Sequence, residues 1–282
     1  MDRTEIESKI KSGVPLTTTD QNGRSFADRI LSVALDLGEH LLHCGGEINR
    51  VENTIERICR AYGAKHVEVF TITSVIVAEV RMSDGSYSSQ IRRVLQSEMG
   101  TDLSTLERLN AISRRICEEK LDPEKAKELI KDAKKGYPFP ILSSIIGAVL
   151  AAGAFAVFFG GNIADGIIAA IIGAAMNVFD SKKPPFINKM ASTVISSFLG
   201  GILSCLMVHL VGIAGISCNV DKVIIGTIML LVPGTLFGYA LRDLMFGDTL
   251  SGTLKIIQSV LVASMIALGY SLAILIAGGI GI

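Results

Sequence analysis

Three consecutive residues inside an apolar run, Pro233-Gly234-Thr235 in MLLVPGTLFGYALRDL, combine types that could bind a small anion. Proline removes a backbone hydrogen bond and glycine loosens the chain, so a helix here is expected to kink or to break. A break would leave free N–H groups and a positive helix end at membrane depth. These groups could bind a carboxylate, with the Thr235 hydroxyl as a further donor. The spacing is compatible with a kink and with a break.

Charged residues follow the same run, where Arg242-Asp243 is succeeded by Asp248 in GDTLSG. Ionisable groups at the end of an apolar helix could form a gate or couple proton movement. Anchoring at the membrane interface and helix capping are the alternative interpretation. Asn177 lies within another apolar stretch and is a further polar candidate, whereas Asp165 is predicted to be a helix cap.

A second group of candidates lies in GGEINRVE, which contains Gly46, Glu47, Arg50 and Glu52. Carboxylates near a helix start are stabilised by the helix dipole. This group could make ion pairs within its own domain, or it could signal to the rest of the chain. The sequence leaves both interpretations open.

The remaining reactive residues do not form a recognisable catalytic or metal site. His40, His43 and Cys44 are close along one predicted helix, but their spacing matches no known metal motif, so we expect ordinary surface or partly buried residues. The five cysteines are scattered without CxxC, which indicates reduced thiols. GxSxG, HExxH and P-loop patterns do not occur. We therefore predict no enzyme, no cofactor, no metal and no direct use of ATP.

The charges divide the chain into two unlike halves. Only six of 27 Lys and Arg, and five of 27 Asp and Glu, follow Pro140. The second half is therefore too apolar for a soluble domain, and the chain is predicted to be a membrane protein. The net charge of zero gives no reason to expect nucleic-acid binding. The polar start, MDRTEIESKIKSG, lacks the apolar core of a signal peptide, so the first half is expected in the cytoplasm.

The first half is predicted to be a loose leader, residues 1–25, followed by a cytoplasmic α+β domain, residues 26–136. Apolar residues at helical spacing predict helices from Phe26 to Leu41 and from Ile48 to near Gly63. The period then changes to two, which predicts strands at 66–72, 74–82 and 87–95. Helices are expected again at 103–119 and 123–135, the last with Asp122 as its N-cap.

The second half, residues 137–282, is predicted to be an all-α bundle of about five transmembrane helices. It is approached through Tyr137-Pro138-Phe139-Pro140, and the expected spans are 141–159, 162–179, 188–213, 223–244 and 253–277. Lys and Arg lie mostly on one side of these spans, which places the N-terminal domain inside and the C-terminus outside. Small residues predict close helix contacts, within the chain or with another subunit; they are Gly147/Ala151, Gly200-Gly201, Gly212/Gly215, Gly234/Gly238 and Gly278-Gly279.

Two stretches resemble the threonine/serine exporter family. They are GGEINRVENTIERICRAYG followed by VEVFTITSVIVAEV, and VPGTLFGYALRDLMFGDTLSG. The family's PG and RD–GD motifs map onto Pro233, Gly234, Arg242, Asp243, Gly247 and Asp248. Its N-terminal motif maps onto Gly46, Glu47, Arg50, Val51 and Glu52. The resemblance covers nearly everything from residue 27 to the C-terminus.

The resemblance implies a multi-pass protein of the plasma membrane that exports small carboxylate-bearing metabolites, driven by an ion or proton gradient. Full-length members resemble two five-span units in one chain, whereas this chain has one unit plus the soluble domain. It is similar to split members, which work with a smaller, separately encoded membrane subunit, and a homo-oligomer is the other possibility. One split system implies dicarboxylates such as succinate instead of threonine or serine. The alternative function is a regulatory or sensor subunit whose partner forms the pore.

Overall fold

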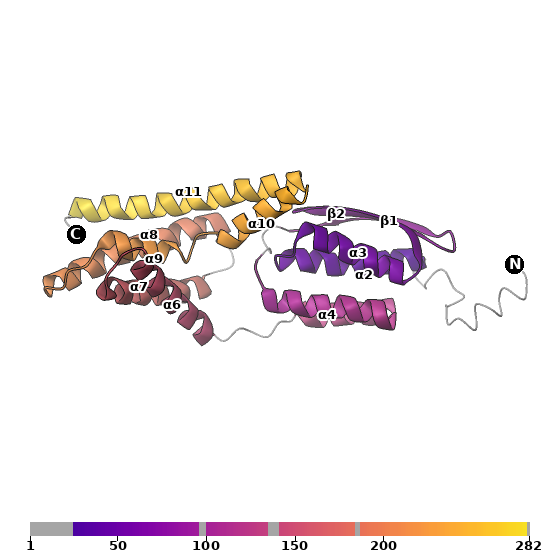
Figure 1. The fold of residues 1–282 in the computed structure, drawn as a ribbon, viewed down its shortest axis with the longest axis horizontal. Helices are drawn as coiled ribbons and strands as arrows, with labels where there is room; N and C mark the ends of the chain where they lie inside the picture. Colours follow the sequence, from indigo (N-terminus) through magenta and orange to yellow (C-terminus); the bar gives the residue numbers. More distant parts are fainter. Residues whose placement is uncertain (1–24, 96–99, 135–140, 184–186, 281–282) are drawn as a thin grey trace, which may run out of the picture. The chain divides into compact units, whose positions relative to one another are not determined.

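The computed structural model of this 282-residue chain describes residues 25–95, 100–134, 141–183 and 187–280. The chain forms two compact units (Figure 1). The first unit extends to Gly136 and includes Asp243–Ser251, and the second comprises Tyr137–Arg242 and Gly252–Ile282. The predicted leader, except for Ser25, and the predicted approach at 137–140 lie outside the described residues.

The first unit contains an antiparallel sheet of three strands in the order β1-β2-β3. The strands are β1 (Ala64–Ile72), β2 (Val75–Met82) and β3 (Tyr87–Arg93), which confirms the three predicted strands. Alternate residues of β2, among them Ile76 and Val80, are buried on one face, whereas Phe70 and Ile91 are exposed on the other. The sheet is therefore covered on one face only.

Helices α2 (Phe26–His43) and α3 (Ile48–Ala61) pack against the buried face of the sheet, as Figure 1 shows. Ser25 and Asp28 form a capping box that begins α2, and Asp28 also accepts a hydrogen bond from the Ser88 hydroxyl of β3. The unit is completed by α4 (Leu103–Glu119) and α5 (Pro123–Lys134). All four predicted helices of this half are confirmed, and the fully buried side chains include Leu31, Leu35, Ile55, Ile58, Ile76, Leu109 and Ile116.

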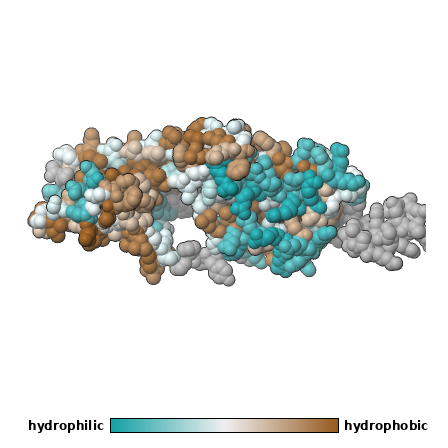
Figure 2. Space-filling model, in the orientation of Figure 1, coloured by the Kyte–Doolittle hydropathy of each residue, from teal (hydrophilic) through white to brown (hydrophobic). Residues whose placement is uncertain are grey.

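The second unit is helical. Among the described residues, four helices are long and apolar enough to cross a membrane, namely α6 (Ile141–Phe158), α7 (Ile163–Ser181), α8 (Lys189–Ile213) and α11 (Thr249–Ile280). They match the first, second, third and fifth predicted spans. The predicted fourth span consists instead of two short helices, α9 (Val220–Ile228) and α10 (Gly234–Met245). Figure 2 shows the contrast between the apolar surface of these helices and the polar surface of the first unit.

Some of the predicted small-residue contacts occur within this chain. A Cβ added at Gly201 would lie 2.5 Å from the Cβ of Ala273, and one at Gly200 would lie 2.8 Å from the Tyr270 hydroxyl, so α8 and α11 approach closely. Among the described residues, no atom lies within 4 Å of a Cβ at several other predicted positions, namely Gly147, Gly212, Gly215, Gly234, Gly238, Gly278 and Gly279. Contacts of those glycines with another subunit stay a prediction.

Candidate functional site

The chain is broken, not merely kinked, at Pro233. Helix α9 ends at Ile228, and the amide of Val232 still bonds to the Ile228 carbonyl over 3.1 Å. Pro233 has no N–H with which to continue this pattern, and α10 begins at Gly234. The Phe237 amide donates to the Pro233 carbonyl over 3.1 Å, which closes the first turn of α10. The Gly234 amide donates to the Val232 carbonyl over 2.8 Å, so within the described residues the N–H groups that the break presents are those of Thr235 and Leu236.

The end of α9 is held in place by a buried hydrogen bond to α11. The Tyr270 hydroxyl donates to Thr227 Oγ1 over 2.9 Å, and Thr227 Oγ1 donates to the Ile224 carbonyl over 2.9 Å. Tyr270 is only 3% exposed, and it packs with Ile224 and Ile266. This contact fixes the last turn of α9 immediately before the break.

A pocket of about 240 Å³ lies among α6, α7 and the turn that follows α9. Its polar groups are Ser144 of α6 and Asn177 and Asp180 of α7. The amide Nδ2 of Asn177 donates to Ser144 Oγ over 2.9 Å, which links the two helices. The remaining lining is apolar or small and consists of Gly147, Ala148, Met176, Leu230 and Leu231. A pocket in which a few polar groups converge is typical of a small-molecule site.

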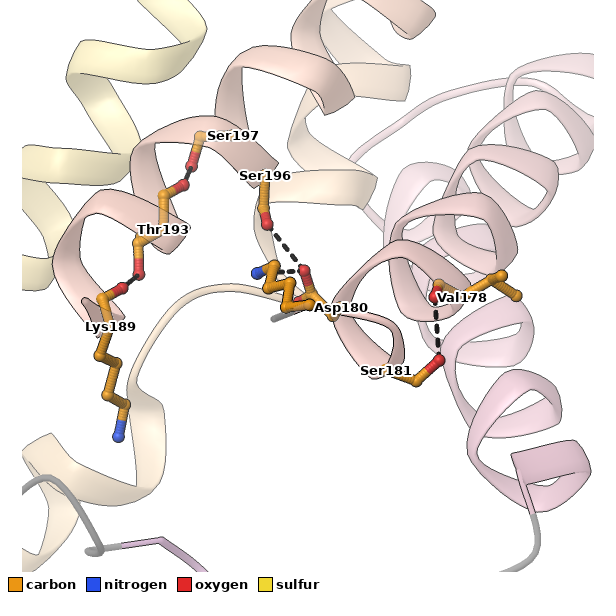
Figure 3. Close-up of polar contacts among 8 residues, drawn as sticks. Val178, Asp180, Ser181, Lys189, Thr193, Ser196 and Ser197 are labelled. Atoms are coloured by element: carbon orange, nitrogen blue, oxygen red, sulfur yellow. Dashed lines mark hydrogen bonds and ion pairs between the residues drawn. The ribbon is translucent and has the colours of Figure 1, made fainter. Parts of the chain in front are cut away.

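Asp180 carries the negative charge of this pocket. Its Oδ1 accepts a hydrogen bond from the Ser196 hydroxyl of α8 over 2.7 Å and pairs with the Lys183 ammonium (Figure 3). Within the described residues, no protein group bonds to Asp180 Oδ2 or to Asn177 Oδ1. The neighbouring hydroxyl of Ser181 donates to the Val178 carbonyl of its own helix and does not line the pocket. The pocket therefore offers two oxygen acceptors to a ligand.

The pocket contains one predicted site residue, Asn177, and the turn that leads to three others. Pro233 is half-buried, whereas Gly234 and Thr235 are exposed in the first turn of α10, and none of the three lines the pocket. The break at Pro233 is two residues beyond Leu231, which does line it. The pocket and the start of α10 are thus consecutive along the chain.

Asp165 is the predicted cap, and it also connects two helices. It is fully buried, and it forms a capping box with Asn162 at the start of α7. Its other oxygen, Oδ1, accepts the amide of Asn219, the residue before α9, over 2.8 Å. Asp165 therefore fixes where the broken pair of helices begins.

Two of the predicted gate residues, Arg242 and Asp243, lie in the last turn of α10, and Asp248 lies in the connection to α11. Asp243 is 3% exposed, Arg242 is exposed and Asp248 is half-buried. Gly247 has φ +93°, which favours glycine, and the Asp248 amide bonds to the Asp243 carbonyl over 2.9 Å. The motif therefore builds a tight turn, and Arg242, Asp243 and Asp248 each take part in a further polar or electrostatic interaction.

The N-terminal motif builds the connection between α2 and α3 and joins α3 to the sheet. Gly46 has no room for a side chain, because a Cβ there would lie 2.6 Å from the Leu41 carbonyl oxygen. Glu47 is the N-cap residue of α3 and Arg50 is exposed. Glu52 Oε1 accepts the Thr71 amide of β1 over 2.7 Å.

Burial raises the pKa of Glu52, and the hydrogen bond from the Thr71 amide opposes this shift. Val51, the fifth member of the motif, is fully buried in the core. The contacts of Gly46, Val51 and Glu52 thus lie within the first unit.

Sequence reasoning did not select Asp180, Ser144 or Lys183 as site residues. Asp180 is one of only five acidic residues after Pro140, and it follows Asn177 by three positions, so both lie on one side of α7. That spacing could have identified Asp180 as a site residue from the sequence. The contribution of Ser144, which comes from another helix, had no such signal.

Comparison with known proteins gives one family. The sequence model of the family described as threonine/serine exporter (ThrE) matches residues 32–277 of this chain. This match includes the pocket, the break at Pro233 and all of the predicted site residues. The searches of curated proteins and of solved structures found no match.

Proposed function

We propose that this chain, which belongs to the threonine/serine exporter family, is a subunit of a secondary exporter that binds its substrate in the pocket beside the α9–α10 break. The family is one of membrane transporters, and four apolar helices agree with a membrane protein. The proposed location is the plasma membrane, with the N-terminal unit in the cytoplasm and the C-terminus outside.

The observation that carries this proposal is the set of acceptors in the pocket. A substrate ammonium has three N–H donors, and Asp180 Oδ2 and Asn177 Oδ1 are two oxygens without a protein partner among the described residues. The ammonium of threonine or serine would compete with Lys183 for Asp180. The displaced Lys183 would then be able to pair with the substrate carboxylate, and Ser144 could bond to the substrate hydroxyl.

The same charge argues against a dicarboxylate as the preferred substrate. Succinate has no ammonium that could displace Lys183 from Asp180, so its carboxylates would lie near Asp180 without gaining Lys183 as a partner. Thr235 and the first amides of α10 are the proposed next contact for the substrate carboxylate, because a helix N-terminus favours negative charge. Movement of α10 about the break at Pro233 is the proposed means of passage.

Efflux from preloaded cells tests the pocket. Labelled threonine, serine and succinate would be compared in cells that contain the chain alone or with its presumed smaller membrane subunit. Asp180→Asn should lower threonine efflux about tenfold or more, because it removes the negative charge that pairs with the substrate ammonium. It should also shift the threonine-to-succinate ratio towards succinate, which a purely structural defect would not do.

The matched control is Ser181→Ala, one residue away and outside the pocket, which should leave efflux unchanged. All variants must be compared at equal abundance in the membrane. The proposed site would be refuted if both Asp180→Asn and Asn177→Ala exported threonine at the wild-type rate. Efflux from cells that contain the smaller subunit without this chain would favour the regulatory alternative.

A cytoplasmic gate at Arg242, Asp243 and Asp248 is a second part of the proposal. It is supported by the burial of Asp243 and by the tight turn at Gly247. Asp243→Asn and Arg242→Ala should each reduce efflux without loss of the protein from the membrane. Unchanged efflux in both variants would remove the gate.

A further inference from the structure

The first unit has an edge strand, β1, in which every second residue directs its backbone N–H and C=O groups away from the sheet. In the described part of the chain the strand order is β1-β2-β3, so β1 has a partner on one side only. Amides of successive residues in an antiparallel strand point to opposite sides, so those of every second residue point to the same side. The Thr71 amide donates to Glu52 and not to β2, so Val69 and Val67, two and four residues earlier, also direct N–H and C=O groups outward.

A groove of about 590 Å³ runs beside this edge. One wall is a single face of α3, formed by Asn49, Glu52, Asn53 and Glu56 at helical spacing. The other side consists of β1 residues 67–70, continued by Val77, Ala78, Glu79 and Ser89. Val67 and Val69, whose outward backbone groups lie on this edge, therefore line the groove.

The groove is acidic, with an apolar position at one side. Four glutamates line it, and none of its twelve lining residues is Lys, Arg or His. Two of these glutamates already have basic neighbours at the rim, since Glu56 pairs with Arg60 and Glu68 with His66. Phe70 is 57% exposed on the outer face of the sheet.

We propose that this groove binds an extended segment of a partner protein, which adds to β1 as a fourth strand. The backbone of the segment bonds to Val67 and Val69, as in strand addition at an open sheet edge. Its side chains alternate between the two faces. Those directed to α3 are Lys or Arg, opposite Glu52 and Glu56, and those on the outer face of the sheet, beside Phe70, are apolar.

The probe is a fluorescein-labelled hexapeptide of alternating lysine and valine, added to the full chain in detergent micelles. Fluorescence anisotropy should show saturable binding, and hydrogen exchange of the fragment containing β1 should slow when the peptide is bound. The double variant Glu52→Gln/Glu56→Gln should bind about threefold to tenfold more weakly, as expected for loss of two partly exposed ion pairs. The matched control is Glu107→Gln/Glu118→Gln, two exposed carboxylates of α4 that do not line the groove, and its affinity should not change.

A second peptide of the same sequence, N-methylated at every second residue on the edge that faces β1, separates strand addition from simple charge attraction. Its affinity should fall below detection, because it lacks the donors that a new strand requires. Equal binding of the two peptides would overturn the proposal. So would unchanged exchange of the β1 fragment, or no saturable binding at millimolar peptide.

Discussion

Replacing Thr227 by valine should destabilise the membrane helices more than replacing Tyr270 by phenylalanine, although both changes remove one hydrogen bond. The bond joins the Tyr270 hydroxyl to Thr227 Oγ1 over 2.9 Å. Thr227→Val leaves the Tyr270 hydroxyl, in a residue only 3% exposed, without its acceptor. Tyr270→Phe leaves the Thr227 hydroxyl bonded to the Ile224 carbonyl. The two variants therefore differ in whether a buried donor is left without a partner.

The expected free energies follow from this difference. A buried polar group without a partner costs about 1–3 kcal/mol, whereas loss of a satisfied hydrogen bond costs about 0.5–1.5 kcal/mol. We expect about 2 kcal/mol for Thr227→Val and about 1 kcal/mol for Tyr270→Phe. Hydrogen bonds between membrane helices couple by about 0.6 kcal/mol on average and by up to about 1.7 kcal/mol. The double variant should be no less stable than Thr227→Val alone.

Equilibrium unfolding by dodecyl sulfate in mixed micelles gives the three free energies. Far-UV circular dichroism is the signal of choice, because the sequence contains no Trp. Ser264→Ala is a suitable control: its hydroxyl is exposed on α11 and bonds to its own helix, so the change should be within about 0.5 kcal/mol. Equal destabilisation by the two single variants, with a coupling below about 0.3 kcal/mol, would refute the reasoning.

Three further predictions concern other contacts. Burial raises the pKa of the Cys59 thiol to about 12, so at pH 8 native protein should react with iodoacetamide far more slowly at Cys59 than unfolded protein does; equal rates by mass spectrometry would contradict this. Glu52→Ala should destabilise β1 by about 1–3 kcal/mol, since the Thr71 amide loses its acceptor. Glu52→Gln keeps that acceptor, and because burial raises the pKa of Glu52 its charged form opposes folding at neutral pH, so it should not destabilise; hydrogen exchange of β1 distinguishes the two. Gly201→Ala should cost about 1–3 kcal/mol by crowding α11, whereas Gly147→Ala should cost nothing, and dodecyl sulfate unfolding compares them.

Local patterns were sufficient for the elements of the first unit. Alternation at 66–72 and 74–82 predicted β1 and β2, because side chains on a pleated strand alternate between a buried and an exposed face. Helix starts were also readable where the cap is local: the Glu124 amide bonds to Asp122, two residues earlier. Apolar length alone identified the four long helices of the second unit.

The sequence also determined that the helix at Pro233 must be disturbed, since proline has no N–H to donate. Whether the result is a kink or a break depends on what holds the two sides. The structure shows a break, with the end of α9 fixed to α11 through Thr227 and Tyr270, which are 43 residues apart. A contact of that kind is set by the rotation and packing of whole helices, and no local period encodes it.

The candidate pocket illustrates the same limit. Asn177 and Asp180 could be placed on one side of a helix from their spacing, but their partners come from elsewhere: Ser144 is 33 residues from Asn177, and Ser196 is 16 residues from Asp180. Similarly, Glu52 meets the Thr71 amide only because α3 packs along β1. The sequence by itself determined which segments are apolar, helical or extended, because those properties depend on near neighbours. Only the tertiary structure decided which polar side chains face one another, because that depends on how the segments pack.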